Sequence, residues 1–225
     1  MGAKTAKKSQ KGLIFTEYKA KEFLQKYAET HKALLLNQKE VKKLLLEKRF
    51  SLNFTFPLVL KISSDILIHK TEENAVKIVY NEQDFFKTLT DFDKKIIKYK
   101  ARGIIVEEFV SGREILLGIK KDKTFGHVIG MGLGGIFTEI VKDISFRACP
   151  IESEDFDSML NDLKFKSLIL GIRGKKNNIE TLKKLVIEVS KIPLKNPNIE
   201  ELDINPLILN EKSCKIVDAR IIFEK

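Results

Sequence analysis

The chain has 225 residues, of which 43% are hydrophobic and 32% are charged, a balance typical of a folded globular protein. No stretch is apolar enough for a membrane span, and the two cysteines, Cys149 and Cys214, have no spacing that would suit a zinc ribbon or a disulfide framework. We therefore expect a cytoplasmic protein that folds around its own hydrophobic core.

The chain is basic, with 41 Lys and Arg against 31 Asp and Glu and a net charge of +10. Four of these lysines fall in the first eleven residues, which hold no apolar segment for a secretory signal, and we interpret residues 1–15 as a disordered basic tail. The rest mixes Lys with Glu and has no Trp and four Tyr, so it lacks a stacking platform for nucleic acid. A general solvated surface or a phosphate-rich small ligand is favoured over nucleic acid, and a basic nucleic-acid module is the weakest hypothesis.

The first hundred residues show helical and strand-like spacing in turn. Thr16 is a candidate N-cap, and Asn37 followed by Glu40 resembles a capping box. The patterns predict helices at 16–27 and 37–50, strands at 58–62 and 75–80, and a helix at 84–98.

From Gly103 the pattern changes to short apolar runs separated by turn residues, which is typical of an antiparallel meander. The predicted strands are 104–106, 115–117, 128–129 and 146–151, followed by helices at 154–163 and 179–192 and by strands at 199–209 and 214–221. Helices and antiparallel strands in blocks predict the α+β class.

The last two predicted strands bring three polar residues together. Because strand side chains alternate, Asp203 and Asn205 share one face. A turn at 210–213 places Asp218 directly opposite Asn205. The three side chains offer oxygen ligands suited to Mg²⁺. The spacing alone leaves the polar outer face of an ordinary hairpin as the favoured alternative.

Two basic residues on strands are candidates for phosphate contact. Lys61 ends an apolar strand and can reach a phosphate from a rigid element, with a snorkelling lysine as an equal alternative. Arg147 stands between Phe146 and Ala148, so its guanidinium faces away from them, and it suits either a phosphate or a structural ion pair.

The segment 130–135 satisfies the pattern GxGxxG, but only residues 136–143 separate it from the next predicted strand. That is too short for the crossover helix of a dinucleotide-binding unit, so we favour a turn. His31 and His127 are expected to be structural. His69 lies in the segment that leaves the Lys61 strand, where it is either a phosphoryl-accepting nucleophile or, more commonly, a surface histidine.

Several strings resemble the ATP-grasp β subunit of ADP-forming acetyl-CoA synthetase, in the order of that family: VLKISSDILIHK (59–70), the run 103–147 that begins GIIVEEFV, LILGIRG (168–174), IEELDINPLIL (199–209) and IVDARI (216–221). The resemblance runs from about residue 16 to the end of the chain. It implies an ATP-grasp fold of two α+β subdomains with the nucleotide cleft between them. It also implies the conversion of acyl-CoA, ADP and phosphate into acid, CoA and ATP.

The resemblance divides the chain and assigns roles. Residues 16–102 would hold the small ATP-grasp subdomain and residues 103–225 the large one. The nucleotide, ADP or ATP with Mg²⁺, would contact Lys61 through its phosphates and Glu107, Glu108, Phe109, Val110 and Glu114 around the base and ribose. Asp203, Asn205 and Asp218 would hold Mg²⁺, Arg147 would steady the transferred phosphate, and His69 would relay the phosphoryl group to ADP.

The same resemblance implies an α subunit that carries the CoA-binding domains and the first phosphohistidine, in an α2β2 hetero-oligomer. Two alternatives remain: a β subunit like that of succinyl-CoA synthetase, and a non-catalytic ATP-grasp scaffold.

Two segments depart from the family pattern. Asn74-Ala75-Val76 replaces the usual Gly-Gly-Val, and each added Cβ restricts the backbone near the phosphates. Ala28-Glu29-Thr30 follows Tyr27 where the family has a tight Tyr-Gly-Ile-Pro turn. We expect a weaker nucleotide affinity or a reshaped loop.

Overall fold

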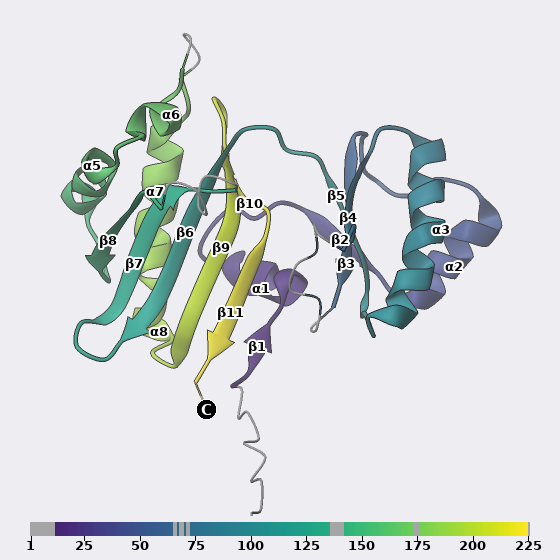
Figure 1. Ribbon diagram of the computed structural model, residues 1–225, viewed down its shortest axis with the longest axis horizontal. Helices are drawn as coiled ribbons and strands as arrows, with labels where there is room; N and C mark the ends of the chain where they lie inside the picture. Colours follow the sequence, from purple (N-terminus) through teal and green to yellow (C-terminus); the bar gives the residue numbers. More distant parts are fainter. Residues whose placement is uncertain are drawn as a thin grey trace, which may run out of the picture.

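The computed structural model describes residues 12–64, 67, 70, 73–135, 142–172 and 176–224. Two antiparallel sheets lie side by side, each covered by its own helices (Figure 1). Two separate hydrophobic cores correspond to these two halves. The α+β class and the division into two parts are confirmed.

The larger sheet has seven strands among the described residues, in the order β1-β11-β9-β6-β7-β8, with β10 also paired to β9. Its strands are β1 (Ile14–Phe15), β6 (Arg113–Asp122), β7 (Gly126–Leu133), β8 (Ile144–Ala148), β9 (Ile199–Leu209), β10 (Cys214–Ile216) and β11 (Ala219–Phe223). Their alternation places Leu202 and Ile204 in the core and leaves Asp203 and Asn205 on the opposite face.

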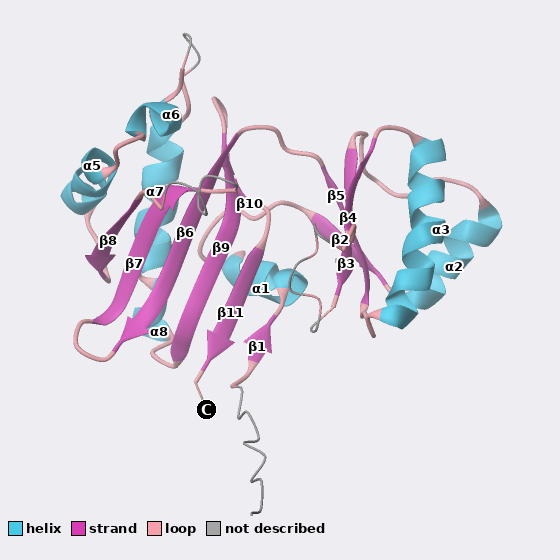
Figure 2. Ribbon diagram, viewed as in Figure 1, coloured by secondary structure: helices cyan, strands magenta, loops and turns pink. Residues whose placement is uncertain are grey.

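Helices cover one face of this larger sheet (Figure 2). They are α1 (Glu17–Leu24), α5 (Ser153–Asp162), α6 (Lys166–Leu170), α7 (Ile179–Ser190) and α8 (Ile192–Lys195). Apolar residues such as Leu24, Phe156 and Val186 pack from these helices onto the sheet. The other face carries Asp203, Asn205 and Phe146.

The smaller sheet has four strands in the order β2-β5-β3-β4. These strands are β2 (Ala33–Leu36), β3 (Leu58–Ser63), β4 (Val76–Val79) and β5 (Gly103–Glu108), and the helices α2 (Gln38–Glu47) and α3 (Glu82–Lys98) cover them. Phe85, Leu89 and Phe92 of α3 are completely buried against this sheet. Because α2 and α3 lie on the side away from the larger sheet (Figure 1), the opposite face of the small sheet looks toward the other half.

The predicted helix start at Asn37 is confirmed in detail. The Asn37 side chain accepts hydrogen bonds from the backbone N–H of Lys39 (2.9 Å) and Glu40 (3.1 Å), and the Glu40 carboxylate accepts one from the Asn37 N–H at 2.7 Å. Such a cap contributes about 1 kcal/mol. Thr16 occupies the N-cap position of α1, but its side chain makes no capping hydrogen bond.

The predicted division at residues 102 and 103 is wrong. β5, which we placed in the antiparallel meander, pairs with β2 and β3 of the smaller sheet, so the chain enters the larger sheet only at β6. α1 belongs to the larger half instead of the smaller one. β1 pairs with β11 of the larger half, so the prediction of a disordered tail is wrong for residues 14 and 15. An apolar run specifies a buried strand but not the sheet that the strand joins, because pairing is decided by contacts distant in sequence.

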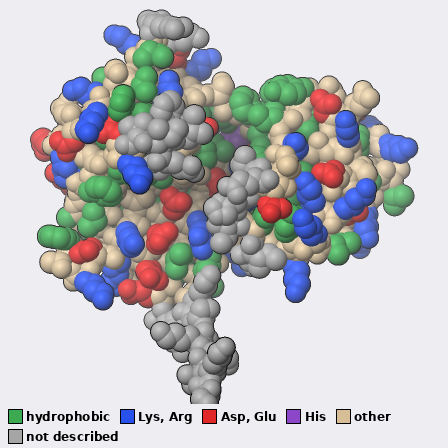
Figure 3. All heavy atoms as spheres, in the orientation of Figure 1, with side chains coloured by type: hydrophobic (Ala, Val, Ile, Leu, Met, Phe, Trp, Pro, Cys, Tyr) green, Lys and Arg blue, Asp and Glu red, His purple; other side chains and the backbone are tan. Residues whose placement is uncertain are grey.

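The strand predicted at 214–221 is two strands, β10 and β11, and the sequence patterns missed β1, β2, α6 and α8. On the face shown in Figure 3, the described Lys and Arg side chains are interspersed with Asp and Glu over the larger half. None of the helices in the described part of the chain has the length and apolar character needed to cross a membrane.

Candidate functional site: a charged cleft between the two sheets

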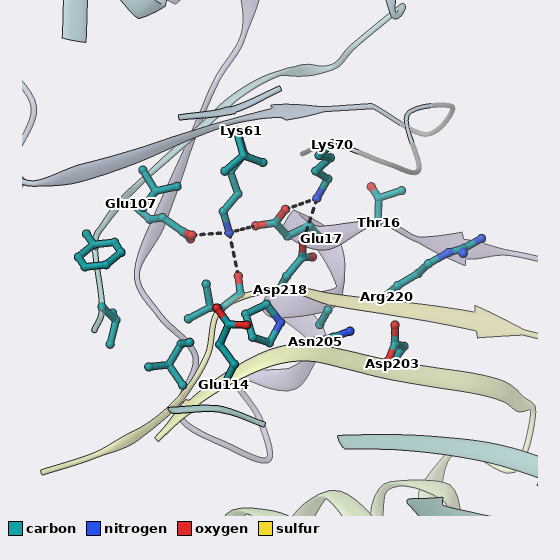
Figure 4. A pocket seen from close by; sticks show the side chains of 18 of the residues that line it. Thr16, Glu17, Lys61, Lys70, Glu107, Glu114, Asp203, Asn205, Asp218 and Arg220 are labelled. Carbon is teal, nitrogen blue, oxygen red and sulfur yellow. Dashed lines mark hydrogen bonds and ion pairs between the residues drawn. The ribbon is translucent and has the colours of Figure 1, made fainter. Parts of the chain in front are cut away.

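A cavity of about 730 Å³ lies between the two halves of the molecule, a volume typical of small-ligand sites. Residues of the smaller half that line it include Val59, Lys61, Val76, Ile78 and Glu107, and residues of the larger half include Asp203, Asn205, Ile208, Asp218 and Arg220. A close view shows how these side chains converge (Figure 4). A ligand in this cavity touches both sheets.

Lys61 reaches the cavity because of its position on β3. Leu60 and Ile62, its neighbours, face the core under α2 and α3, so Lys61 faces the cleft. On the adjacent strand β5, Glu107 pairs with Val59 in register and therefore shares that face. The strand pairing thus sets the lysine and the carboxylate next to each other.

Lys61 and Lys21 form a buried network with two carboxylates. Lys61 Nζ lies 2.8 Å from Glu17 Oε1 and 2.5 Å from Glu107 Oε1. Lys21 Nζ lies 2.6 Å from Glu107 Oε2 and 3.3 Å from Glu17 Oε1. Both ammonium groups also donate to the Val217 carbonyl. The network joins β3 and β5 of the small half to α1 and the β10–β11 connection of the large half.

The opposite charges of the network keep its carboxyl and ammonium groups ionised. Burial raises the pKa of the Glu17 carboxyl, but Lys61, Lys70 and Lys21 outweigh this and hold it well below its usual range. Burial likewise lowers the pKa of the Lys61 ammonium, whereas Glu17 and Glu107 raise it above its usual value. Lys61 is therefore a fixed cation at neutral pH, held on the wall of the cleft.

The register of the C-terminal hairpin is confirmed. Ala219 pairs with Ile204 and Arg220 with Asp203, and the Asn205 N–H donates to the Asp218 carbonyl at 3.2 Å. Asp218 therefore lies beside Asn205, as we predicted. Asp203, Asn205 and Asp218 all line the same cavity as Lys61.

The donor set suits a hard divalent cation. Burial, together with repulsion from Glu201 and Asp218, raises the pKa of Asp203 to about 6, and burial and Glu17 also raise the pKa of Asp218. Carboxylates crowded in this way favour a bound cation. In the part of the chain that the structure describes, no group of three or more His, Cys, Asp or Glu side chains is arranged to hold a metal ion. Two carboxylates and the Asn205 amide would therefore need phosphate or water oxygens to complete the coordination.

The chain between the two sheets forms another wall of the cavity, where Glu108, Phe109, Val110 and Glu114 all border it. The Glu108 carboxylate accepts hydrogen bonds from Thr55 N (2.8 Å) and Thr55 Oγ1 (2.6 Å), which lower its pKa. Together with Val59 and Ile78, Phe109 and Val110 supply an apolar surface for a flat ring.

Glu107 requires a different assignment from the one we predicted. Its side chain borders the cavity but is completely buried and engaged with Lys21 and Lys61. It serves to hold the lysines and is not positioned to contact a ribose.

Arg147 does not lie in the cleft. It pairs with Ile129 on the core side of β7, and its guanidinium contacts Asp162 Oδ2 and Ser158 Oγ of α5, each at 2.7 Å. The structural ion pair is thus the alternative that the structure bears out. Because side chains alternate along β8, it is Phe146 that faces the open side of the sheet.

His69 lies outside the described residues, so its relay role stays a prediction. His31 and His127 are structural, as expected. The His31 ring bonds to the Glu108 carbonyl (2.6 Å) and the His127 ring to the Ile199 carbonyl (2.7 Å).

The segment 130–135 ends β7 and enters a turn of an antiparallel sheet, which agrees with our rejection of a dinucleotide-binding motif. A Cβ at Gly132 would stand 2.3 Å from the Asp143 carbonyl oxygen, and one at Gly130 would stand 2.7 Å from the Phe146 ring. These glycines permit close packing against β8.

Sequence reasoning missed four residues of the site: Glu17, Lys21, Lys70 and Arg220. Glu17 and Lys21 are four residues apart on α1, which by itself is the spacing of an ordinary surface ion pair. Only tertiary packing shows that they are buried.

The fold and the cleft define a class of protein. Residues 6–223 match the family model of the ATP-grasp domain, and the chain belongs to that family.

Within this family, the chain belongs with the β subunits of ADP-forming acetate–CoA ligases. It is 38% identical over 181 residues to the β subunit of acetate–CoA ligase (ADP-forming) I of Pyrococcus furiosus, which is 77% of this chain and 78% of that protein. It is 31% identical over 220 residues to the β subunit of acetate–CoA ligase (ADP-forming) II of the same organism, which is 92% of this chain and 91% of that protein. Other relatives are longer: acetate–CoA ligase I of Archaeoglobus fulgidus is 34% identical, but the chain spans 25% of its length.

The solved structures agree. Acetyl-coenzyme A synthetase 1 of Ca. Korarchaeum cryptofilum, in complex with coenzyme A and Ca-AMPCP, superposes with a TM-score of 0.81 at 32% identity, covering 96% of this chain and 95% of that one. A second structure of that protein holds Mg-AMPPCP, with a phosphohistidine segment pointing towards the nucleotide binding site, and gives a TM-score of 0.77, again at 32% identity, over 94% and 93% of the chains.

Proposed function

We propose that this chain is the nucleotide-binding β subunit of an ADP-forming acyl-CoA synthetase. It transfers a phosphoryl group from a phosphohistidine to ADP while the complex converts acyl-CoA and phosphate into acid and CoA. The observation that carries this proposal is that Lys61 of one sheet and Asn205 and Asp218 of the other border a single cavity large enough for a nucleoside diphosphate. The related structure with Mg-AMPPCP supports it.

The residues of the cleft have different roles in this proposal. Phe109 and Val110 hold the base beside the connection between the sheets, and Lys61, which Glu17 and Glu107 hold in place as a cation, supplies positive charge toward the phosphates from the wall of the cleft. Asp203, Asn205 and Asp218 hold Mg²⁺, which when bound neutralises phosphate charge. Transfer of the phosphoryl group between a histidine and ADP depends on this positioning and charge neutralisation.

The phosphoryl group has to arrive from a partner. In this proposal an α subunit carries the CoA-binding domains and the first phosphohistidine, and the two chains assemble as an α2β2 hetero-oligomer. The relative of Archaeoglobus fulgidus, of which this chain spans a quarter, is consistent with further functions outside the ATP-grasp part.

A second cavity, of about 570 Å³, offers a path for that partner. It lies on the open face of the larger sheet, is lined by Leu116, Val128, Ile144 and Phe146 among others, and shares Asp203 with the nucleotide cleft. We propose that the partner's phosphohistidine segment lies in this groove. Asp203, which lines both cavities, supports this placement.

The test uses the complex reconstituted with its α partner, supplied with acetyl-CoA, phosphate and ADP. We expect His69→Ala and Asp218→Asn each to lower ATP formation at least a hundredfold, whereas Lys183→Met, which breaks a surface ion pair with Asp157, leaves it unchanged. Calorimetry that detects no binding of ADP with Mg²⁺ would instead support the scaffold alternative. Trials with succinyl-CoA in place of acetyl-CoA test the succinyl-CoA synthetase alternative.

A further inference from the structure

Lys70 connects the predicted cation site to the buried network. Its Nζ lies 3.1 Å from Asp218 Oδ2 and also pairs with Glu17 Oε2 (Figure 4). The ammonium therefore stands between a carboxylate of the network and a carboxylate expected to bind Mg²⁺.

Lys70 differs from the other two lysines of the cluster in its exposure and in its described partners. Lys21 and Lys61 are each held by Glu17, Glu107 and the Val217 carbonyl, and their side chains are 3% and 6% exposed. The Lys70 side chain is 17% exposed. Its flexible four-carbon stem allows the ammonium to leave one carboxylate without losing the other.

Asp218, by contrast, is held by its backbone. Its N–H donates to the Pro206 carbonyl at 3.3 Å, and its own carbonyl accepts from Asn205 at 3.2 Å. The backbone of Lys70 is also tied, because its carbonyl accepts from Ala75 N at 2.7 Å. The contact between Lys70 and Asp218 is made by side-chain atoms, and these backbone hydrogen bonds do not depend on it.

We propose that Lys70 is a built-in counter-ion of the cation site. Its ammonium competes with a divalent cation for the Asp218 carboxylate, and Glu17 retains it beside the cleft when the cation binds. The inference rests on the proposed function, since it takes Asp218 as a cation ligand. Nucleotide phosphates would offer the displaced ammonium a new partner, so cation and nucleotide would bind cooperatively.

The experiment measures Mn²⁺ binding to the full chain without nucleotide, by the loss of the free-Mn²⁺ electron paramagnetic resonance signal. We expect Lys70→Met to bind Mn²⁺ about tenfold tighter than the wild type, because a competing charge in direct contact is removed. Lys70→Arg, which keeps the charge, should bind no tighter than the wild type. Should Lys70→Met not fold, as judged by circular dichroism, Lys70→Gln takes its place.

Lys215→Met is the matched control, because it removes the same charge three residues from Asp218 at a lysine paired with Glu29 (3.2 Å). We expect less than a twofold change there. Adding Asp218→Asn to Lys70→Met should cancel the gain. The inference is overturned if Lys70→Met binds Mn²⁺ no tighter than the wild type, if Lys215→Met gains as much, or if the gain survives loss of the Asp218 carboxylate.

The experiment distinguishes failure of the counter-ion role from failure of the proposed function. A wild type that binds Mn²⁺ together with ADP, alongside a Lys70→Met variant without tighter Mn²⁺ binding, overturns only the counter-ion role. Mn²⁺ binding by neither protein, with or without ADP, overturns the cation site and the proposed function as well.

Discussion

At the scale of single residues, the cleft depends on charges that are buried only because they are paired. Glu17 and Glu107 are 3% and 0% exposed, and Lys61 contacts both. Removal of one partner leaves an uncompensated charge in the interior, which costs more than the pair contributes.

Lys61→Met should therefore destabilise the protein as well as weaken ADP binding. We expect the free energy of unfolding to fall by about 3 kcal/mol, measured by urea denaturation at pH 7. Lys61→Met with Glu107→Gln should recover part of the loss, because the unpaired carboxylate is gone. A Lys61→Met variant as stable as the wild type would contradict the network's role.

Asn74, where the resemblance leads us to expect Gly, has an unusual backbone conformation. Its φ is +50°, in the left-handed region that Asn tolerates and most other residues avoid. Ala75 is completely buried and still bonds to both Lys70 and Ile62. The loop thus closes with Asn-Ala where the family has Gly-Gly.

Substitutions at Asn74 should accordingly depend on backbone tolerance. Asn74→Gly should change the free energy of unfolding by less than about 0.5 kcal/mol, whereas Asn74→Val should lower it by about 1–2 kcal/mol. Thermal unfolding followed by circular dichroism measures both. Equal effects of the two variants would show that the left-handed conformation is not what Asn74 supplies.

At the scale of elements, strand alternation and hairpin register decide most of the site. β9 has the bounds predicted from its alternating pattern, and its pairing with β11 places Asp218 beside Asn205. The pattern also crowds Asp203 against Glu201 and Asp218 on this face, with Arg220 opposite.

That crowding makes stability depend on pH. The pKa of Asp203 is raised from 3.8 to about 6 in the folded chain. The folded chain therefore binds the proton of this carboxyl more tightly than the unfolded chain does. As a result, the free energy of unfolding falls as pH rises from 4 to 6. With divalent cations removed by chelation, Asp203→Asn should be about 2 kcal/mol more stable than the wild type at pH 7 and equal to it at pH 4. The same difference at both pH values would rule out this carboxyl as the cause.

At the scale of the whole molecule, the site exists because two sheets with separate cores face each other across one cavity. The proposed groove for the partner shares Asp203 with this cavity and includes Phe146, whose side chain is 59% exposed. An aromatic residue on such a surface is a suitable anchor for a partner.

Phe146→Glu should weaken association with the α partner at least tenfold, measured by analytical ultracentrifugation, while the chain alone binds ADP with Mg²⁺ as before. Leu194→Glu is the control, since Leu194 is 66% exposed on α8, in the helix layer behind the sheet. Unchanged association for Phe146→Glu, or an equal loss for both variants, would contradict the groove as the docking surface.

The sequence by itself determined the family, the α+β class, the capping box at Asn37 and the pairing of Asn205 with Asp218, because these depend on periodicity, turn length and motifs read within short stretches. It placed Lys61 and Asp218 in one cleft only through family resemblance. Tertiary structure alone decided that β5 joins the smaller sheet, that Arg147 faces α5, and that Glu17 and Lys21 are buried beside Lys61. The physical reason is that strand pairing and the burial of a charge depend on residues far away in the chain, and local sequence patterns do not identify those residues.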